Sequence, residues 1–408
     1  DSDLEFLRSM TSEDLGALVE ILTGKQDDKN LAEELTMHDK YKQFYPDHIK
    51  YVEEIMGELQ CFGANTFATM FRGGKGVLYR EILCDVCDKM KVNYNKESPV
   101  ERIEDELFSK ILRDSMDKMS EEEIKKFATE AGFNTAKGFG KQAVFIAMQT
   151  AIKAGGFASY QLALIVANTV AKAVLGSGLT LATNAGITRA IGVFAGPIGW
   201  VITGAWTAVD VAGPAFRITI PAVIQVAFLR QKLNNAVDIF LTGETGVGKD
   251  TIYHILKDGK FGVWDSTSRL DRKKFDAFGR MLRIINTAGA KENDKENIEA
   301  RKELPSDTRY VYVFNAYDYF TNAKIKKQVN LDIEIHKDLC DEDEHQWHLK
   351  IIGTHKDICL KNGISEAEIQ ALASEIGREC QILDLTTYNG KEAQENLYDF
   401  IVGKEKQW

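Results

Sequence analysis

The residues of this chain best suited to chemistry form one glycine-rich stretch, Gly243-Glu244-Thr245-Gly246-Val247-Gly248-Lys249-Asp250. An apolar run at residues 237–242 precedes it, and a helix-like run that begins at Thr251 follows it. Glycines let backbone N–H groups turn inward around a phosphate, and the next helix adds free N–H groups and the positive end of its dipole. The lysine supplies positive charge to the outer phosphates. The spacing G-x-x-x-x-G-K between a strand and a helix therefore predicts a nucleotide-binding phosphate loop.

A second motif, Thr354-His355-Lys356-Asp357, predicts which base is bound and follows an expected strand at residues 348–353. GTPases carry N-K-x-D at this place, and the T-H-x-D form resembles that of Roc-type GTPases. The Asp357 carboxylate can accept hydrogen bonds from two guanine N–H groups, whereas adenine has no such donor pair. The motif predicts GTP or GDP as the ligand, and the alternative is an aspartate that only caps a helix. Thr386 and Thr387 are expected near the guanine carbonyl.

Two positions depart from the usual magnesium ligands of such a site. Asp250 stands where a serine or threonine normally binds Mg²⁺, and Asn286-Thr287-Ala288-Gly289 occupies the place of D-x-x-G. Together the changes exchange one carboxylate and one neutral oxygen ligand, so we expect Mg²⁺ to be held by Asp250 and Asn286. The alternative is a degenerate site that binds nucleotide weakly. Thr251 could also serve at the nucleotide site, although it is one residue late for the usual metal ligand.

Residues 261–274 lie where the first switch segment of a GTPase is expected. Thr267 is the candidate for the threonine that contacts Mg²⁺ and the γ-phosphate, and Ser266 and Ser268 are equally near. The N–H of Gly289 is the candidate γ-phosphate sensor. Ala290 follows it in place of the glutamine that orients the attacking water. Hydrolysis is therefore expected to be slow unless a protein partner or a homodimer mate donates the missing group.

The fold class predicted for the chain is an α-helical N-terminal domain followed by a C-terminal α/β domain like that of P-loop GTPases. Within residues 234–408, further strands are expected at 280–285, 309–315, 348–353 and 381–385, with a closing helix at 391–402. This alternation predicts a doubly wound parallel sheet. Residues 1–141 are predicted to be an acidic helical domain, with a helix after a Thr11 cap and others at 48–59, 77–92, 99–119 and 121–130.

Residues 142–232 are rich in glycine and alanine and carry few charges, so they are treated as a separate apolar region. Their uncharged stretches are long enough for a membrane-inserting helical hairpin. Polar residues and Pro197, Pro214 and Pro221 interrupt these stretches, which favours a buried helical bundle packed with residues 1–141. Peripheral lipid contact is a third interpretation. We expect the nucleotide-free protein to stay in solution without detergent.

Composition narrows the remaining possibilities. A chain of 408 residues with a net charge of −10 is expected to form two or three domains and not to bind nucleic acid. Six irregularly spaced cysteines and no secretory signal at Asp1 indicate the reducing cytoplasm, with membrane association left open. Cys84 and Cys87 form a C-x-x-C pair. A zinc site would need Cys61 and His48 as well, so two thiols on one helix face is the favoured interpretation.

Three segments carry a family resemblance: GELQCFG at 57–63, LYREIL at 78–83 and FRITIPAV at 216–223. With them, residues 1 to about 232 resemble the YaaW-like family of uncharacterised bacterial proteins, also described as ubiquinol–cytochrome c chaperone-like. The resemblance implies no established activity, and the chaperone label alone predicts none.

The two parts together predict a guanine-nucleotide-dependent switch. GTP would order the loop around Thr267 and the loop at residues 286–291, and the helical domain would respond. Two other interpretations stay open. One is a membrane-active effector whose apolar region is released on nucleotide exchange. The other is a pseudo-GTPase scaffold that no longer turns over.

Overall fold

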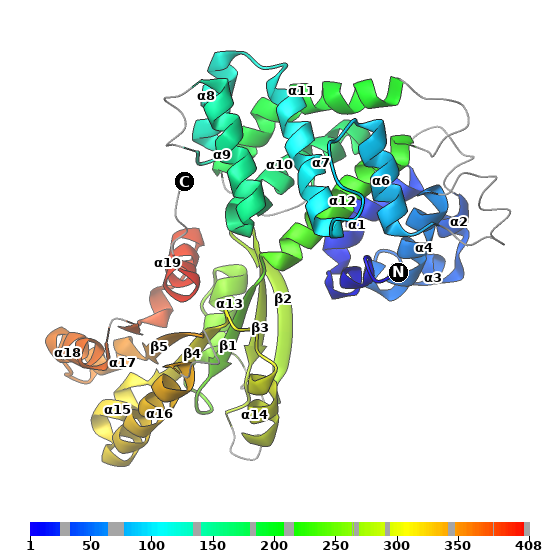
Figure 1. Ribbon diagram of the computed structural model, residues 1–408. Coiled ribbons are helices and arrows are strands. Elements are labelled where there is room, and N and C mark those ends of the chain that lie inside the picture. The colour runs from blue at the N-terminus through cyan, green and yellow to red at the C-terminus, as the bar shows by residue number, and fades with distance from the viewer. Residues whose placement is uncertain are drawn as a thin grey trace. The chain divides into compact units, whose positions relative to one another are not determined.

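The computed structural model describes residues 1–24, 33–63, 77–133, 140–179, 185–207, 216–262, 264, 269–289, 294–341, 347–377 and 379–403. The chain divides into two compact units, Asp1–Asn235 and Ala236–Lys406. The first is helical and the second is built on a sheet (Figure 1).

The described part of the first unit consists of helices. In chain order they are η1 (Glu5–Ser9), α1 (Ser12–Thr23), α2 (Glu33–Met37), α3 (Asp39–Phe44), η2 (His48–Tyr51), α4 (Val52–Gly63), α6 (Tyr79–Lys89), α7 (Val100–Met116), α8 (Glu121–Glu130), α9 (Lys141–Ala154), α10 (Gly156–Leu175), α11 (Ala185–Thr207) and α12 (Phe216–Asn234).

Side-chain caps decide where some of these helices begin. The Thr11 hydroxyl accepts the N–H of Asp14, and the Asp14 carboxylate accepts the N–H of Thr11 in return. Ser120 and Glu123 form the same reciprocal cap on α8, whose bounds coincide with the predicted 121–130. These caps satisfy backbone N–H groups that have no partner inside a helix.

Three other predicted helices have different bounds. The helix predicted at 77–92 is α6 and stops before Lys91, whose φ of 55° is incompatible with a continuing helix. The helix predicted at 99–119 corresponds to α7 and is shorter at both ends. Pro99 adopts an extended conformation at its N-cap, and residues 117–119 form a turn. The run predicted at 48–59 begins as the 3₁₀ helix η2 and continues as α4.

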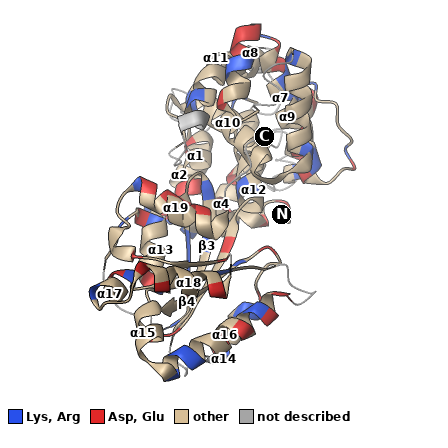
Figure 2. Cartoon of the chain, turned by 90° about the vertical axis from the view of Figure 1, so that its left-hand side faces the viewer, with Lys and Arg blue, Asp and Glu red and all other residues tan. Residues whose placement is uncertain are grey.

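Helix α10 is the core of the first unit. It packs against α1, α7, α9, α11 and α12, and the Gln225 side chain of α12 donates to the carbonyl of Ala167 at 3.0 Å. Figure 2 shows charges along α16 of the second unit, whereas α10 carries only Lys172. Among the residues described, α10 is the one helix long and apolar enough to cross a membrane. Of its apolar 18-residue stretch, 72% is buried within the protein. A core helix has the same length and composition.

Prolines do not interrupt the apolar region as expected. Pro197 lies inside α11 and Pro221 inside α12, so the expectation of broken runs is wrong at both positions. Proline keeps a helical φ and removes one backbone hydrogen bond, a loss that a long, packed helix can tolerate. Pro214 lies outside the described residues.

The second unit contains a six-stranded sheet in the order β2-β3-β1-β4-β5-β6. The strands are β1 (Val237–Thr242), β2 (Asp271–Ala277), β3 (Arg280–Asn286), β4 (Arg309–Asn315), β5 (His348–Thr354) and β6 (Cys380–Ile382). The helices are α13 (Lys249–Asp258), α14 (Asp294–Lys302), α15 (Ala316–Thr321), α16 (Ala323–Asp341), α17 (Lys356–Lys361), α18 (Glu366–Ile376), η4 (Leu385–Thr387) and α19 (Lys391–Val402).

The sheet is mixed, so the prediction of a wholly parallel sheet is wrong. Strands β3, β1, β4, β5 and β6 pair in parallel, but β2 pairs antiparallel with β3. Phe278 and Gly279 connect these two strands with φ of 49° and 81°. A two-residue turn with both φ values positive is the usual connection of a tight hairpin.

Strand β2 also shortens the predicted first switch segment. Residues 261–274 were expected to be a loop, but β2 begins at Asp271. Its sequence, DRKKFDA, lacks the apolar alternation that signals a strand, and Arg272, Lys273 and Lys274 are exposed. Charged side chains on an edge strand prevent further strands from pairing with it. The charged residues that made β2 hard to predict as a strand therefore also protect the edge of the sheet.

Helices cover both faces of the sheet. Val311 and Val313 of β4 belong to a buried cluster that includes α13 and α19. Tyr312 and Phe314 point the other way, into a cluster with α15, α16 and α18. The last strand is shorter than the predicted 381–385, because β6 ends at Ile382 and Leu385 begins η4.

Candidate functional site

The strand order changes direction at β1, which lies between β3 and β4. In open α/β sheets, ligands bind beyond the carboxyl ends of the strands where such a change occurs. The glycine loop follows β1 there (Figure 1). Leu241 pairs with Asn286 and Asn315 with Thr354, so the ends of β1, β3, β4 and β5 meet at this edge. The topology therefore gathers three of the predicted motifs.

Backbone geometry explains the glycines of the loop. Gly243, Gly246 and Gly248 have φ of 142°, 79° and 100°, which side chains of L-residues disfavour. A Cβ atom on Gly243 would lie 2.1 Å from the carbonyl oxygen of Val313. Glu244, Thr245 and Gly246 are exposed at the outer turn. The loop is thus tight against β4 and open to solvent on the side where a phosphate would bind.

Lys249 is directed back over the loop that precedes it. Its ammonium group donates to the carbonyl oxygens of Gly243 and Glu244 at 2.7 and 2.8 Å. The residue is only 4% exposed, and burial lowers the pKa of the ammonium to about 8. A phosphate oxygen at the loop would offer this charge a stronger acceptor than a neutral carbonyl.

Asp250 and Asn286 are in direct contact. The Asn286 Nδ2 atom donates to Asp250 Oδ1 at 2.7 Å, and Asn286 is buried. Because a carboxylate only accepts hydrogen bonds, the amide nitrogen must face Asp250 and the amide oxygen must face elsewhere. In this conformation Asn286 orients the carboxylate and does not present its own oxygen beside it.

The loop after β3 is fixed against the glycine loop. A Cβ atom on Gly289 would lie 2.2 Å from the backbone nitrogen of Thr245, so only glycine permits this approach. The N–H of Thr287 donates to Leu241 at 3.0 Å, and Asn297 of α14 donates to the carbonyl of Ala288 at 2.9 Å. The two loops are thus in backbone contact, and Gly289 lies beside the place where a ligand of the glycine loop would bind.

The motif after β5 is joined to the glycine loop by Thr354. This residue is 0% exposed, and its hydroxyl donates to the carbonyl of Val247 at 2.7 Å. His355 follows with a φ of 60°, which turns the chain into α17. The Asp357 side chain in the first turn of α17 is 16% exposed and lies 3.1 Å from the ammonium of Lys361. Its carboxylate thus remains partly accessible, while Lys356 is paired with Glu366 at 2.7 Å.

Thr386 and Thr387 lie in η4 and bond to a residue that sequence reasoning did not single out. Asp384 accepts the backbone N–H of Thr386 at 3.0 Å, and its carbonyl accepts the Thr387 hydroxyl at 2.8 Å. Both threonines are exposed. The neighbouring Leu385 packs near Gly248. Asp384 is the N-cap of η4. An aspartate directly before a short helix is the sequence feature that could have identified it.

Roles were also predicted for Thr251 and for residues of the two switch loops. Thr267, Ser266, Ser268 and Ala290 lie outside the described residues. The Thr251 hydroxyl donates to the carbonyl of Gly262 at 3.3 Å.

The C-x-x-C pair lies on α6, with Cys87 buried and Cys84 half-buried. Burial raises the pKa of the Cys87 thiol, which opposes metal binding as a thiolate. His48 contacts the hydroxyl of Tyr51 instead. In the described parts of the chain, no group of three or more metal-ligating side chains forms.

Comparison with known proteins concerns the first unit. Residues 47–224 match the family described as Ubiquinol-cytochrome C chaperone, and residues 1–31 match a domain of unknown function (DUF3944). A UPF0174 protein of Helicobacter pylori strain J99 is 51% identical over 237 residues, which cover 58% of this chain and 93% of that protein. The chain belongs to the UPF0174 family.

More distant relatives agree with this assignment. Another UPF0174 protein, from Helicobacter pylori strain 26695, is 45% identical over 205 residues, 49% of this chain and 98% of its own length. UPF0174 protein YaaW of Escherichia coli K12 is 33% identical over 243 residues, 57% of this chain and 95% of its own length. The predicted resemblance to the YaaW-like family is confirmed. The matched residues 1–31 and 47–224 lie within the helical unit.

Proposed function

We propose that the second unit is a P-loop GTPase-like domain of the Ras/Roc kind that binds GTP and GDP with Mg²⁺. In this proposal the chain is a guanine-nucleotide-dependent switch with slow intrinsic hydrolysis, and the helical UPF0174 unit is the effector that responds. Its partners are the nucleotide and a further protein, or a second copy of this chain.

One observation carries the proposal. The Thr354 hydroxyl donates to the Val247 carbonyl at 2.7 Å across 107 residues of sequence. This bond ties the loop suited to phosphates to the motif suited to guanine, at the edge of the sheet where ligands bind. A phosphate loop alone would serve any nucleoside triphosphate, and an aspartate alone would serve as a helix cap. Their physical connection favours a single ligand that carries both groups.

Each residue then has a defined task. Backbone N–H groups of the loop and the Lys249 ammonium would hold the outer phosphates. Asp357 would accept hydrogen bonds from the guanine edge with a carboxylate that contacts Lys361 through one of its oxygens. Mg²⁺ would supply charge neutralisation at the phosphates, with Asp250 as its carboxylate and Asn286 holding that carboxylate in place.

Lys249 provides the most direct test of phosphate binding. Lys249→Met should weaken GTP binding at least about tenfold, because a charge-assisted hydrogen bond contributes on the order of 1.5–3 kcal/mol. The matched control is Lys257→Met at the exposed end of the same helix, α13, which should leave the affinity unchanged. Equal GTP affinities for Lys249→Met and the unmodified protein, in titration calorimetry, would contradict the proposal.

Turnover separates the switch from a pseudo-GTPase scaffold. A switch should release phosphate from bound GTP slowly in a single-turnover assay, and faster with its partner. Tight GTP binding with no phosphate release would assign the scaffold role.

A second candidate function is lipid contact through α11. The side chains that alternate with its buried positions are small or apolar, and Trp200 among them is 69% exposed. Gly192, Gly196 and Gly204 lie on the same exposed line, where an added Cβ would meet nothing within 4 Å. Arg189 is the only charged residue of the helix. An exposed face of this composition suits the interface of a bilayer.

Vesicle binding tests this second candidate. Co-sedimentation with vesicles, in GTP or without nucleotide, should fall with Trp200→Gln. The half-exposed Trp264 of the second unit gives the control variant, Trp264→Gln. Equal sedimentation of the unmodified protein, Trp200→Gln and Trp264→Gln would rule out lipid contact through α11.

A further inference from the structure

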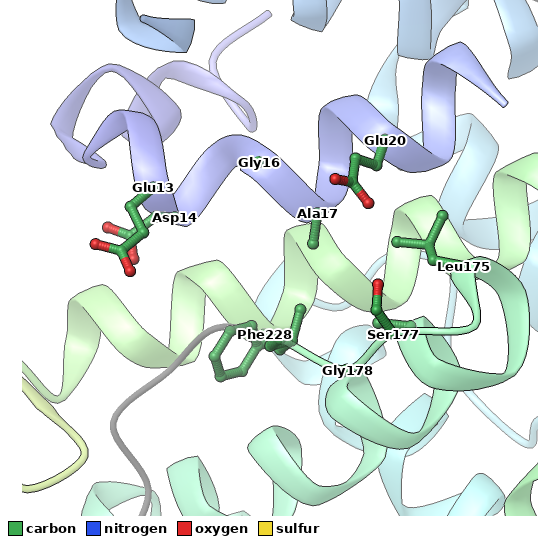
Figure 3. Close-up of a pocket in the computed structure, with 11 residues that line it drawn as sticks. Glu13, Asp14, Gly16, Ala17, Glu20, Leu175, Ser177, Gly178 and Phe228 are labelled. Atoms are coloured by element: carbon green, nitrogen blue, oxygen red, sulfur yellow. The ribbon is translucent and has the colours of Figure 1, made fainter. Parts of the chain in front are cut away.

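The helical unit contains a cavity of about 170 Å³ between α1, the carboxyl end of α10 and α12 (Figure 3). Asp14, the acidic residue buried in its wall, pairs with Lys232 and caps α1 through Thr11. The buried charge is thus already neutralised within the helical unit, so Asp14 does not call for a ligand.

The second unit presents a different kind of surface on α16. Val329, Ile333 and Cys340 are buried on the side of this helix that packs onto the unit. The side opposite to them is exposed, and its residues recur at helical spacing along the whole helix. This outer face of α16 consists of Lys324, Lys327, Leu331, Glu334, Ile335 and Asp338, all of them exposed.

The centre of the outer face is apolar. Leu331 and Ile335 are 49% and 45% exposed, and they are neighbours because they lie four positions apart on one helix. Charged residues stand on both sides of them along the helix (Figure 2). An apolar centre with a polar rim is typical of a protein–protein interface.

The charges of the outer face are separated by sign. Lys324 and Lys327 precede Leu331, whereas Glu334 and Asp338 follow it. Lys324 and Asp338 lie seven positions to either side of Leu331, a distance of roughly 10 Å along the helix at ~1.5 Å per residue. Within the described part of the chain, no ion pair includes any of these four charged side chains.

This order of charges is unfavourable for α16 by itself. A helix dipole favours acidic residues at the amino end and basic residues at the carboxyl end. The first turn of α16 has no acidic residue and its last turn has no basic residue. Lys324 instead lies near the positive end of the dipole and Asp338 near the negative end. An antiparallel neighbour with the same sequence would place each charge beside the end of a helix that favours it.

We propose that the outer face of α16 binds the same face of a second copy of this chain, as an antiparallel pair of helices. A two-fold axis at Leu331 brings the two Leu331 side chains together. Lys324 then lies opposite Asp338 of the second copy, and Lys327 lies opposite Glu334 of the second copy. The face is thus complementary to itself, as a two-fold symmetric interface requires.

One helix from each chain makes a small interface, so the association is expected to be weak. The surface is the one on which a second copy would bind in the proposed function. The association itself does not rest on nucleotide binding.

Sedimentation velocity of the nucleotide-free full chain tests the proposal. The average mass should rise from that of one chain toward that of two between about 1 and 200 μM, a range that covers weak association. Lys327→Glu should weaken self-association at least about fivefold, because two-fold symmetry places like charges together twice. The matched control is Lys257→Glu at an exposed position of α13, which should associate like the unmodified protein.

A charge exchange tests the antiparallel arrangement itself. Glu334→Lys alone should also weaken self-association, since it too places like charges together. In an equal mixture of Lys327→Glu and Glu334→Lys, each reversed charge would face an opposite charge on the other chain, so the mixture should associate within about twofold of the unmodified protein. Both positions are exposed, and circular dichroism confirms that each variant is folded.

Three results would overturn the proposal. They are a single-chain mass for the unmodified protein at every concentration, undiminished self-association of Lys327→Glu, and a mixture that associates no better than its two components. Because no nucleotide is present in this measurement, its outcome is separate from that of the GTP titrations.

Discussion

At the scale of single residues, Asp250 and Asn286 show how two unusual positions are related. Each occupies a place defined by a motif, and the parallel register of β1 and β3 brings the two places together. Their placement at one site was therefore predictable from the sequence. The direction of the amide was not, because it depends on which atom of Asn286 meets the carboxylate.

A double-mutant cycle tests whether the two residues act together. Asp250→Ser should lower GTP affinity in Mg²⁺, because the metal would lose its nearest protein carboxylate. Asn286→Asp added to that variant restores a carboxylate and should recover much of the loss, with a coupling energy of about 1 kcal/mol or more. GTP affinity is measured for all four proteins, with Mg²⁺ and with a chelator. Additive effects, or affinities insensitive to the chelator, would indicate a degenerate site.

At the scale of elements, the clearest sequence signals and the clearest failures have physical causes. The glycine loop was predictable because it needs positive φ at fixed spacings, and buried strands such as β4 were predictable from their apolar runs. Strand β2 was not, because it is an edge strand of charged residues whose place depends on pairing with β3. The prolines within α11 and α12 also led to a wrong prediction, because packing outweighs the local preference of proline against a helix.

Helices α1 and α12 are joined by a buried ion pair between Asp14 and Lys232. Lys232→Met should lower the free energy of unfolding of the helical unit by roughly 3 kcal/mol, because it leaves a buried carboxylate unpaired. Adding Asp14→Asn should recover part of this loss. Denaturant unfolding followed by circular dichroism provides the measurement, and Lys126→Met on the exposed face of α8 provides the control. A loss no greater than that of the control would show that the pair contributes little.

The face of the sheet beneath α16 is predicted to be sensitive to acid. His336 of α16 packs against Tyr310 and Tyr312, and burial lowers its pKa from 6.5 to about 4, opposed by Asp332 and assisted by Arg301. Between about pH 4 and 6.5 the unfolded state therefore binds more protons at this residue. The contribution is constant above this range, and the second unit loses stability as the pH falls through it.

Tryptophan fluorescence can follow this effect, because Trp347 stacks on Tyr310 at 5.6 Å. Denaturant unfolding from pH 4.5 to 7 should show a smaller pH dependence for His336→Gln than for the unmodified protein. Identical pH dependences would mean that His336 titrates normally in the folded unit.

At the scale of the whole molecule, a UPF0174 helical unit and an α/β unit occur in one chain, with α12 ending at Asn234 and β1 beginning at Val237. Sequence resemblance identified the first unit, because residues 1–31 and 47–224 match known families. The nucleotide site proposed for the second unit is inferred from the geometry of its loops. In the proposed switch, binding of a guanine nucleotide to the second unit would change the helical unit.

Base selectivity is therefore the measurement that tests the account most directly. GTP and ATP are titrated in Mg²⁺ into the unmodified protein, Asp357→Asn and Lys361→Gln. GTP should bind the unmodified protein at least roughly tenfold more tightly than ATP, since losing a two-bond contact costs on the order of 1.4 kcal/mol or more. Asp357→Asn should erase the preference, and Lys361→Gln, which removes only the exposed partner of Asp357, should retain it. Equal titration curves for GTP and ATP with the unmodified protein would contradict the account.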